Sequence, residues 1–288
     1  MKRDDFIVFI LSHGRADNVV TYRTLCEQNY TGRIGIVIDN EDEQGAAYKE
    51  KFGAENVFVF DKARVAQEMD EVIKGKRKTV VYARNACFEI AKKIGVKFFV
   101  ELDDDYEYFS YTFTDEMKWC ESREKKTIHN LDSIFDAVLD YFEQTPQITS
   151  IALAQGGDFI GGGESSTTDS CRLLRKAMNS FFCSTDRPFK FIGRINEDVN
   201  TYTAGAHRGM LFFTTNQIGL NQKQTQSQGG GMTEVYLDTG TYLKSFFSVI
   251  CCPSAVKVSV IGTSQKRLHH SIAWNNCAPK ILRETIKK

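Results

Sequence analysis

The sequence predicts an α/β fold in which helices flank a mostly parallel central sheet. Short apolar runs alternate with segments of helical periodicity through the first third of the chain. This alternation is typical of parallel sheets, because a crossover helix must connect each strand to the next. The apolar run Phe98–Val100 also leads into the acidic residues Asp103, Asp104 and Asp105. Sheets of this kind bind ligands at the carboxyl ends of their strands, so we expect a site there.

The first four expected strands are runs of aromatic and β-branched residues, which suit a buried, pleated surface. They cover Phe6–Leu11, Ile34–Ile38, Val57–Phe60 and Phe98–Val100. The helices expected between them cover Asn18–Gln28, Glu43–Phe52, Ala63–Ile73 and Val80–Ile94. Gly95 follows the last of these helices and favours its termination there.

The rest of the chain predicts two helices, three strands and a loop. The helices are Asn130–Phe142, which has apolar residues at helical spacing, and Val235–Val249. The further strands are Ile148–Ala154, Leu211–Thr214 and Val256–Ile261. The segment Gln217–Gly231 is rich in amides and glycines, which predicts a flexible loop, although amides also read base edges.

The acidic triplet is a candidate metal site. Along a strand, Asp103 and Asp105 point to one side and Asp104 points to the other. Two carboxylates on one side suit a hard divalent ion that also holds phosphate, such as Mg²⁺ or Mn²⁺. The alternative is a solvated acidic turn at the end of the strand.

Two other strand ends bring polar residues to the same edge of the sheet. Ser12, Gly14 and Arg15 follow the first strand, and Asp39 follows the second. A carboxylate at the position of Asp39 suits ribose hydroxyls or a base N–H, or it caps the next helix. Arg15 suits a diphosphate or a surface ion pair. Gly14 alone does not indicate a dinucleotide site, because the sequence contains no G-x-G-x-x-G.

Composition narrows the class of protein. The 37 basic and 37 acidic residues give a net charge of zero, but they are unevenly distributed. Residues 171–288 carry 16 Lys and Arg against 6 Asp and Glu, so their net charge is +10 and that of residues 1–170 is −10. The basic half suits a polyanion such as DNA, or it attracts the acidic half.

The eight cysteines form no C-x-x-C, and no run reaches the ~18 apolar residues of a membrane span. We therefore expect reduced thiols in a cytosol, with no membrane partner.

Three short motifs resemble those of GT-A glycosyltransferases. Asp103–Asp105 matches the D-x-D motif, Tyr82–Asn85 resembles the A-R-N motif that faces the donor nucleotide, and Asn196–Asp198 resembles the acceptor-side E-D motif. The resemblance implies a GT-A-like, Rossmann-like fold with a divalent metal, Mn²⁺ or Mg²⁺, and a nucleotide-sugar donor, expected to be a UDP-sugar. It also implies one domain over residues 1–288, with a nucleotide-sugar half (1–110) and an acceptor-side half (111–288).

The resemblance is closer to the TET/JBP-associated glycosyltransferases of tailed phages. The blocks that carry it are Ile10–Asn18, Ala154–Gly162, Asn179–Lys190, Gly193–Tyr202 and Leu268–His270. This group is associated with glycosylation of hydroxymethylated pyrimidines in phage DNA, which protects the genome from restriction. The resemblance implies hydroxymethylated DNA, with 5-hydroxymethylcytosine or its uracil counterpart, as the acceptor. It also implies an enzyme that works in the cytoplasm of the infected bacterium.

The resemblance also implies roles for single residues. Asp198 is expected to take the acceptor proton, with Glu197 holding nearby hydroxyls; inversion and retention both stay open. The expected metal ligands are Asp103, Asp105 and His270, or His269 in place of His270. The residues expected to contact the donor are Ser12, Gly14, Arg15, Asp39, Arg84, Asp103 and Asp104.

Other functions fit parts of the same pattern. They include a glycosyltransferase for a protein or surface glycan, a nucleotidyltransferase and an inactive DNA-binding module. If DNA is the acceptor, the candidates for phosphate contacts are Arg187, Lys190, Arg194, Arg208 and Lys223. Phe181, Phe182 and Phe189 are expected in the core, and stacking on bases is the alternative.

Overall fold

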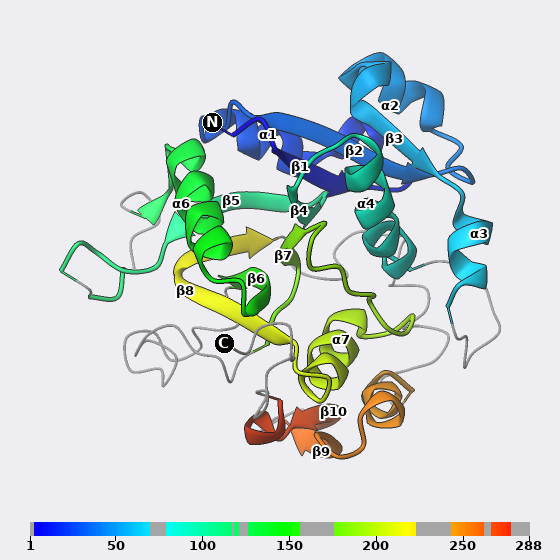
Figure 1. The fold of residues 1–288 in the computed structure, drawn as a ribbon, viewed down its shortest axis with the longest axis vertical. Helices are drawn as coiled ribbons and strands as arrows, with labels where there is room; N and C mark the ends of the chain where they lie inside the picture. Colours follow the sequence, from blue (N-terminus) through cyan, green and yellow to red (C-terminus); the bar gives the residue numbers. More distant parts are fainter. Residues whose placement is uncertain are drawn as a thin grey trace.

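The computed structural model describes residues 3–69, 79–116, 118–120, 126–155, 176–222, 243–261 and 266–277. Its centre is an eight-stranded sheet with the strand order β3-β2-β1-β4-β7-β6-β8-β5 (Figure 1). The strands are β1 (Phe6–Leu11), β2 (Arg33–Asp39), β3 (Val57–Phe60), β4 (Phe98–Asp103), β5 (Tyr106–Tyr111), β6 (Ile148–Gln155), β7 (Ser180–Ser184) and β8 (Leu211–Gln222). Four neighbouring pairs are parallel and three are antiparallel. The predicted fold class is confirmed.

Strand β1 lies between β2 and β4 and is parallel to both. All six of its residues are apolar and buried. Its side chains alternate between two cores, with Phe6 and Val8 in one and Ile7 and Phe9 in the other. A strand that is apolar on both faces is stable only when helices cover both sides of the sheet.

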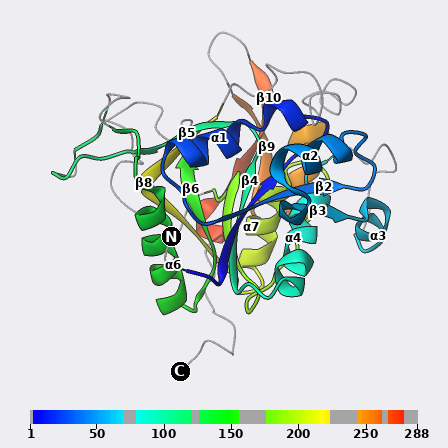
Figure 2. The ribbon, with the colours of Figure 1, turned by 90° about the horizontal axis from the view of Figure 1, so that it is seen from above.

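The helices form two layers, one on each face of the sheet. The first core contains residues of α1 (Val20–Glu27), α2 (Gly45–Phe52) and α6 (Leu131–Gln144). The second contains residues of α3 (Lys62–Gln67), α4 (Val81–Lys93) and α7 (Glu197–Ala206). Figure 2 shows α6 and α4 on opposite sides of the sheet. Among the helices that the structure describes, none is long and apolar enough to cross a membrane.

Two sequence predictions need correction. The helix expected over Ala63–Ile73 ends at Gln67, and residues 70–73 lie outside the described part. The flexible loop expected from Gln217 does not begin there, because β8 continues to Gln222. Strand β5 pairs with this extension and sets Phe109 opposite Leu220. The backbone ladder therefore orders residues that composition alone assigns to a loop, and the rest of that loop lies outside the described residues.

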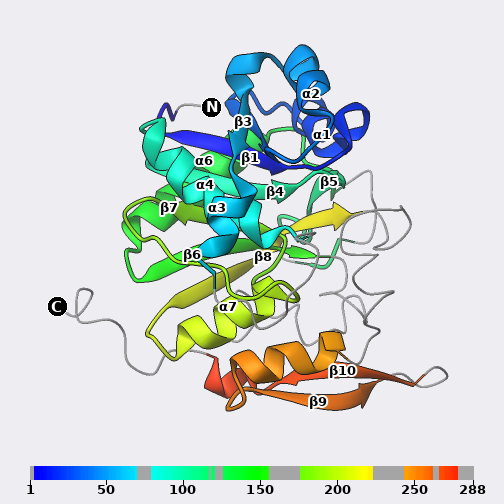
Figure 3. The same ribbon diagram turned by 90° about the vertical axis from the view of Figure 1, so that its right-hand side faces the viewer.

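A second sheet, β9 (Val256–Ile261) and β10 (Arg267–Ile272), is a two-stranded antiparallel hairpin. Residues 243–251 form a helix just before it. Figures 1 and 3 show this helix and the hairpin together beside α7, at the end of the molecule away from β1, β2 and β3. Tyr202 of α7 stacks on Trp274, with ring centroids 5.8 Å apart. The large sheet takes strands from both predicted halves, and the division at residue 110 stays a prediction.

Candidate active site

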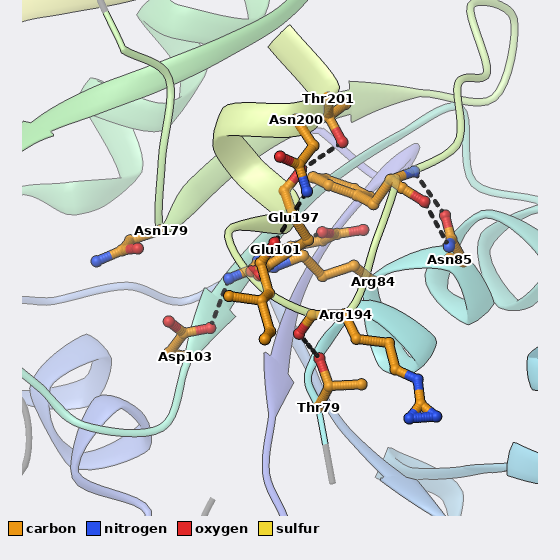
Figure 4. A network of polar contacts seen from close by, with 12 residues as sticks. Thr79, Arg84, Asn85, Glu101, Asp103, Asn179, Arg194, Glu197, Asn200 and Thr201 are labelled. Atoms are coloured by element: carbon orange, nitrogen blue, oxygen red, sulfur yellow. Dashed lines mark hydrogen bonds and ion pairs between the residues drawn. The ribbon is translucent and has the colours of Figure 1, made fainter. Parts of the chain in front are cut away.

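Arg84 of α4 connects the two acidic motifs. Its side chain is 1% exposed. Nη2 donates to Asp103 Oδ1 at 2.9 Å, and Nε donates to Glu197 Oε1 at 3.3 Å. Nη1 lies 3.6 Å from Glu101 Oε2. Figure 4 shows these side chains converging from α4, β4 and α7. The end of β4 and the start of α7 therefore meet at one guanidinium.

A single cation cannot neutralise three carboxylates in a buried cluster. Burial raises the pKa of Glu101 well above its ordinary range, although the charge of Arg84 opposes this rise. Burial therefore favours the protonated form of Glu101, and the guanidinium of Arg84 donates hydrogen bonds to Asp103 and Glu197. The sequence suggested that Arg84 contacts the donor. In the structure its guanidinium lies among these acids and near the rings of Phe181 and Phe191, and its contact with the donor stays a prediction.

The triplet at the end of β4 has the electrostatics of a cation site. The side chain of Asp103 is 26% exposed. Both Asp105 carboxylate oxygens accept hydrogen bonds from Gln222 Nε2 at 3.1 Å. Burial and the charges of Asp103 and Asp104 raise the pKa of Asp105 to about 6. Carboxylates that repel one another in this way are stabilised by a divalent ion, so this hard-oxygen pair fits Mg²⁺ or Mn²⁺.

The expected third ligand, His270, is not assembled with this pair. Among the described residues, no three His, Cys, Asp or Glu side chains gather closely enough to hold a metal. His270 lies on β10, and its Nδ1 is buried without a hydrogen-bond partner in the described part. Burial and the neighbouring His269 lower its pKa to about 4. A neutral imidazole is the form that binds metals, so the role of either histidine stays a prediction.

The loop after β1 lies beside the triplet. Asp104 Oδ2 accepts from Ser12 Oγ at 2.6 Å, and Asp104 Oδ1 accepts from Arg15 Nη1 at 2.9 Å. Gly14 has a φ of +65°, and its N–H donates to Asp42 Oδ2 at 2.8 Å. The structure therefore brings Ser12, Gly14, Arg15 and Asp104 to one edge of the sheet. Their contact with a donor stays a prediction.

The Asp39 carboxylate already has partners for both of its oxygens. Oδ2 lies 2.8 Å from His13 Nδ1 and accepts from Lys62 Nζ at 3.2 Å, while Oδ1 accepts from the Glu41 N–H at 3.0 Å. The hydrogen bond to Asp39 raises the pKa of His13. Burial opposes ionisation of Asp39, but His13 and Lys62 still lower its pKa. The sequence interpretation missed His13, although its position just after the first strand was an available signal.

Glu197 and Asp198, the E-D pair, lie in the first turn of α7, where the helix dipole favours acids. Asn196 precedes the pair with a φ of 54°, and its Nδ2 donates to Lys244 O at 2.8 Å and Ser248 Oγ at 3.1 Å. These bonds hold the start of α7 against the 243–251 helix. Burial and the Asp198 charge raise the pKa of Glu197 to about 7, and burial also raises that of Asp198. A raised pKa makes a carboxylate a better proton acceptor near neutral pH.

One expected DNA contact has a structural role. The guanidinium of Arg187 donates to three backbone carbonyl oxygens at and after the end of α6, those of Phe142, Thr145 and Ile148. Nη1 and Nη2 of Arg187 are engaged in these bonds, and a contact of this residue with phosphate stays a prediction. Phe181, Phe182 and Phe189 are buried, which confirms that they belong to the core. Lys223 lies outside the described residues.

Comparison with known proteins places the chain in a family. The sequence profile of the TET-associated glycosyltransferases matches residues 6–231. No curated protein matches the chain by sequence. Among solved structures, glucosyl-3-phosphoglycerate synthase from Mycobacterium tuberculosis with Mg²⁺ and UDP is similar at 11% identity and a TM-score of 0.47, covering 93% of this chain and 87% of that one. Its complex with Mn²⁺ and UDP-glucose is similar at 8% identity and a TM-score of 0.46, covering 93% and 86%. Because the profile spans most of the sequence, the chain belongs to the TET-associated glycosyltransferase family and is a glycosyltransferase.

Proposed function

We propose that this enzyme transfers a sugar from a UDP-sugar to the hydroxymethyl group of a modified pyrimidine in DNA. The observation that carries the proposal is the meeting of Asp103 and Glu197 on Arg84, which brings the donor-side and acceptor-side acids into one site. Family membership and the charge of +10 in residues 171–288 support a DNA acceptor. The proposed place of action is the cytoplasm of an infected bacterium.

In the proposed reaction, the hydroxymethyl oxygen attacks the anomeric carbon of the sugar. Asp198 takes the proton of that hydroxyl, while Glu197 holds nearby hydroxyls. The bond between the anomeric carbon and the diphosphate oxygen breaks, and the nucleoside diphosphate leaves with the electron pair. Asp103 and Asp105 would hold a divalent metal, which would supply positive charge against the diphosphate.

The acceptor must come within reach of Asp198. In duplex DNA, a hydroxymethyl group on C5 of a pyrimidine lies in the major groove. The enzyme must enter that groove or turn the base out of the stack. A single strand or a flipped base would expose the group most fully, so single-stranded DNA belongs among the test substrates.

Nucleoside diphosphate release tests the proposal. The enzyme is incubated with Mn²⁺, a panel of UDP-sugars, and DNA containing 5-hydroxymethylcytosine or 5-hydroxymethyluracil, with unmodified DNA as the control. We expect release only with hydroxymethylated DNA and a matching mass increase in the digested nucleoside. Pyrophosphate release would indicate nucleotidyl transfer instead. Metal-dependent hydrolysis that ignores the DNA would overturn the DNA acceptor.

A further inference from the structure

Helix α1 and the residue that follows it bury three polar side chains on one face. Thr21 and Thr24 belong to the helix and Gln28 comes directly after it, a spacing that places all three on the same side. None of them is more than 4% exposed. Burying a polar side chain is unfavourable unless it forms hydrogen bonds, so this face must meet polar groups. The partners are backbone atoms of residues 103–109 and 128.

The two later residues of this face bind the backbone of strand β5. Thr24 Oγ1 donates to Tyr106 O at 2.9 Å and to Glu107 O at 3.0 Å. Gln28 Nε2 donates to Phe109 O at 2.9 Å, and Gln28 Oε1 accepts from the Phe109 N–H at 2.7 Å. These contacts all lie beyond the acidic triplet.

Thr21 binds the turn that carries the triplet. Its Oγ1 donates to Asp103 O at 2.6 Å and accepts from the Tyr106 N–H at 2.9 Å. Its own N–H donates to Asp104 O at 3.2 Å. The hydroxyl of one threonine therefore joins the two ends of this turn, and the backbone of the same residue holds its middle.

The strands on either side of this turn do not pair with each other. Strand β4 lies between β1 and β7, whereas β5 pairs with β8 at the edge of the described sheet. In a β-hairpin, the hydrogen bonds between two adjacent strands fix the turn that connects them. Because β4 and β5 are not adjacent, that support is missing here, and the hydrogen bonds of Thr21 close the turn instead.

We propose that Thr21 is a positioning residue for the metal site, because it fixes the backbone that separates the Asp103 and Asp105 carboxylates. The inference rests on the metal dependence in the proposed function. A hard divalent ion binds oxygen ligands within a narrow range of distances, so a shift of this turn should weaken binding. Groups that orient metal ligands without touching the metal commonly change its affinity by about 10–100-fold.

Two substitutions of Thr21 test the inference. Thr21→Val removes the hydroxyl and keeps the shape of the side chain, whereas Thr21→Ser keeps the hydroxyl. Binding of Mn²⁺ without a donor is followed by the electron paramagnetic resonance signal of the free ion. We expect Thr21→Val to weaken Mn²⁺ binding about tenfold or more, and Thr21→Ser to bind it as the wild type does. Amide hydrogen exchange of the turn in the metal-free protein should become faster in Thr21→Val but not in Thr21→Ser.

Thr24→Val is the matched control. It also removes a buried hydroxyl that donates to two backbone carbonyl groups, from a position three residues later on the same face. Its urea unfolding midpoint should therefore fall about as far as that of Thr21→Val. Its Mn²⁺ affinity should equal that of the wild type, because its partners lie beyond the triplet.

The possible outcomes separate the inference from the function on which it rests. Unchanged Mn²⁺ affinity in a folded Thr21→Val, with a wild type that binds Mn²⁺, would overturn the inference alone. Equal losses of Mn²⁺ affinity in Thr21→Val and Thr24→Val would also overturn it, because a general loosening of the fold would explain both. A wild type that binds no Mn²⁺, with or without UDP, would overturn the metal dependence of the proposed function. If Thr21→Val does not fold, the same comparison between Thr21→Ala and Thr24→Ala decides the case.

Discussion

Arg84 Nη2 lies 2.9 Å from Asp103 Oδ1, so an ion pair connects the end of β4, where the acidic triplet begins, to a buried side chain of α4. The same guanidinium donates to Glu197 at the start of α7. Because Arg84 pairs with both acids, the charge balance at both acidic motifs depends on one side chain. The consequences can be measured separately as stability, metal binding and catalysis.

Replacing Arg84 should destabilise the fold strongly. Arg84→Met leaves Asp103 and Glu197 without their shared cation, and breaking a buried ion pair on one side costs about 3–5 kcal/mol. Urea unfolding followed by circular dichroism measures the loss. Arg64→Met is the matched control, because Arg64 forms exposed ion pairs with Glu68 and Glu89 and should leave the midpoint unchanged. Equal midpoints for the two variants would contradict the role assigned to Arg84.

Removing one proposed metal ligand should separate turnover from acceptor binding. Asp105→Ala should abolish Mn²⁺ binding in calorimetry and abolish turnover, and chelation of the metal should inactivate the wild type. DNA affinity should be nearly unchanged. Asp115→Ala, at an exposed acid, is the control and should retain activity. Equal losses of turnover and DNA affinity in Asp105→Ala would instead indicate binding bridged by metal, or unfolding.

The two acids at the start of α7 should contribute unequally to catalysis. Asp198→Asn removes the proposed proton acceptor, so kcat should fall by about 10²–10⁴-fold. Glu197→Gln keeps a hydrogen-bonding group and should cause a smaller fall. Steady-state kinetics with a fixed UDP-sugar measure both variants, and UDP affinity checks that the donor site is intact. Similar losses in the two variants would argue against Asp198 as the base.

The reaction rate should increase with pH through neutrality. Burial raises the pKa of Asp198, and burial with the Asp198 charge raises that of Glu197 to about 7, so part of the pair holds a proton at slightly acidic pH. The base must lose its proton before it can act, so kcat/KM should rise as the pair ionises and then level off. In Glu197→Gln the neighbouring charge is gone, so the rise should move to lower pH. An unmoved profile would show that another group controls it.

Arg187 should matter for stability and not for DNA. Arg187→Met loses three hydrogen bonds to carbonyl oxygens near the end of α6, with an expected loss of about 2 kcal/mol in unfolding free energy. Denaturant unfolding and oligonucleotide binding are measured on the same preparation. A large loss of DNA affinity in a variant of unchanged stability would contradict this expectation and support a phosphate contact of Arg187.

The sequence predicts the strands best where apolar residues are continuous. Phe6–Leu11 and Val57–Phe60 have the bounds that the sequence predicts, because uninterrupted runs of aromatic and β-branched residues favour strands. The prediction failed at Gln217–Gln222, where pairing with β5 orders a segment of loop-like composition. The partner strand β5 lies far away in the sequence, so the local residue pattern does not indicate that β8 continues there.

The acids of the site could be found in the sequence, but their shared partner could not. Asp103, Asp105 and Glu197 belong to recognisable motifs, whereas Glu101 is a single acid within an apolar strand. The burial of Arg84 depends on segments that meet only after folding. The position of His13 also depends on a contact that forms only after folding, because its Nδ1 pairs with Asp39 of the next strand.

The position of β4 has a consequence for how the site is preserved during fluctuations. Strand β4 lies between β1 and β7, and every residue before Asp103 is buried. Such a strand exchanges its amide hydrogens through global unfolding, whereas edges and loops open locally. We therefore expect the backbone of β4 to stay closed while the periphery opens and recloses. The position of Asp103, at the end of this strand, is thus expected to be protected by the full cooperativity of the fold.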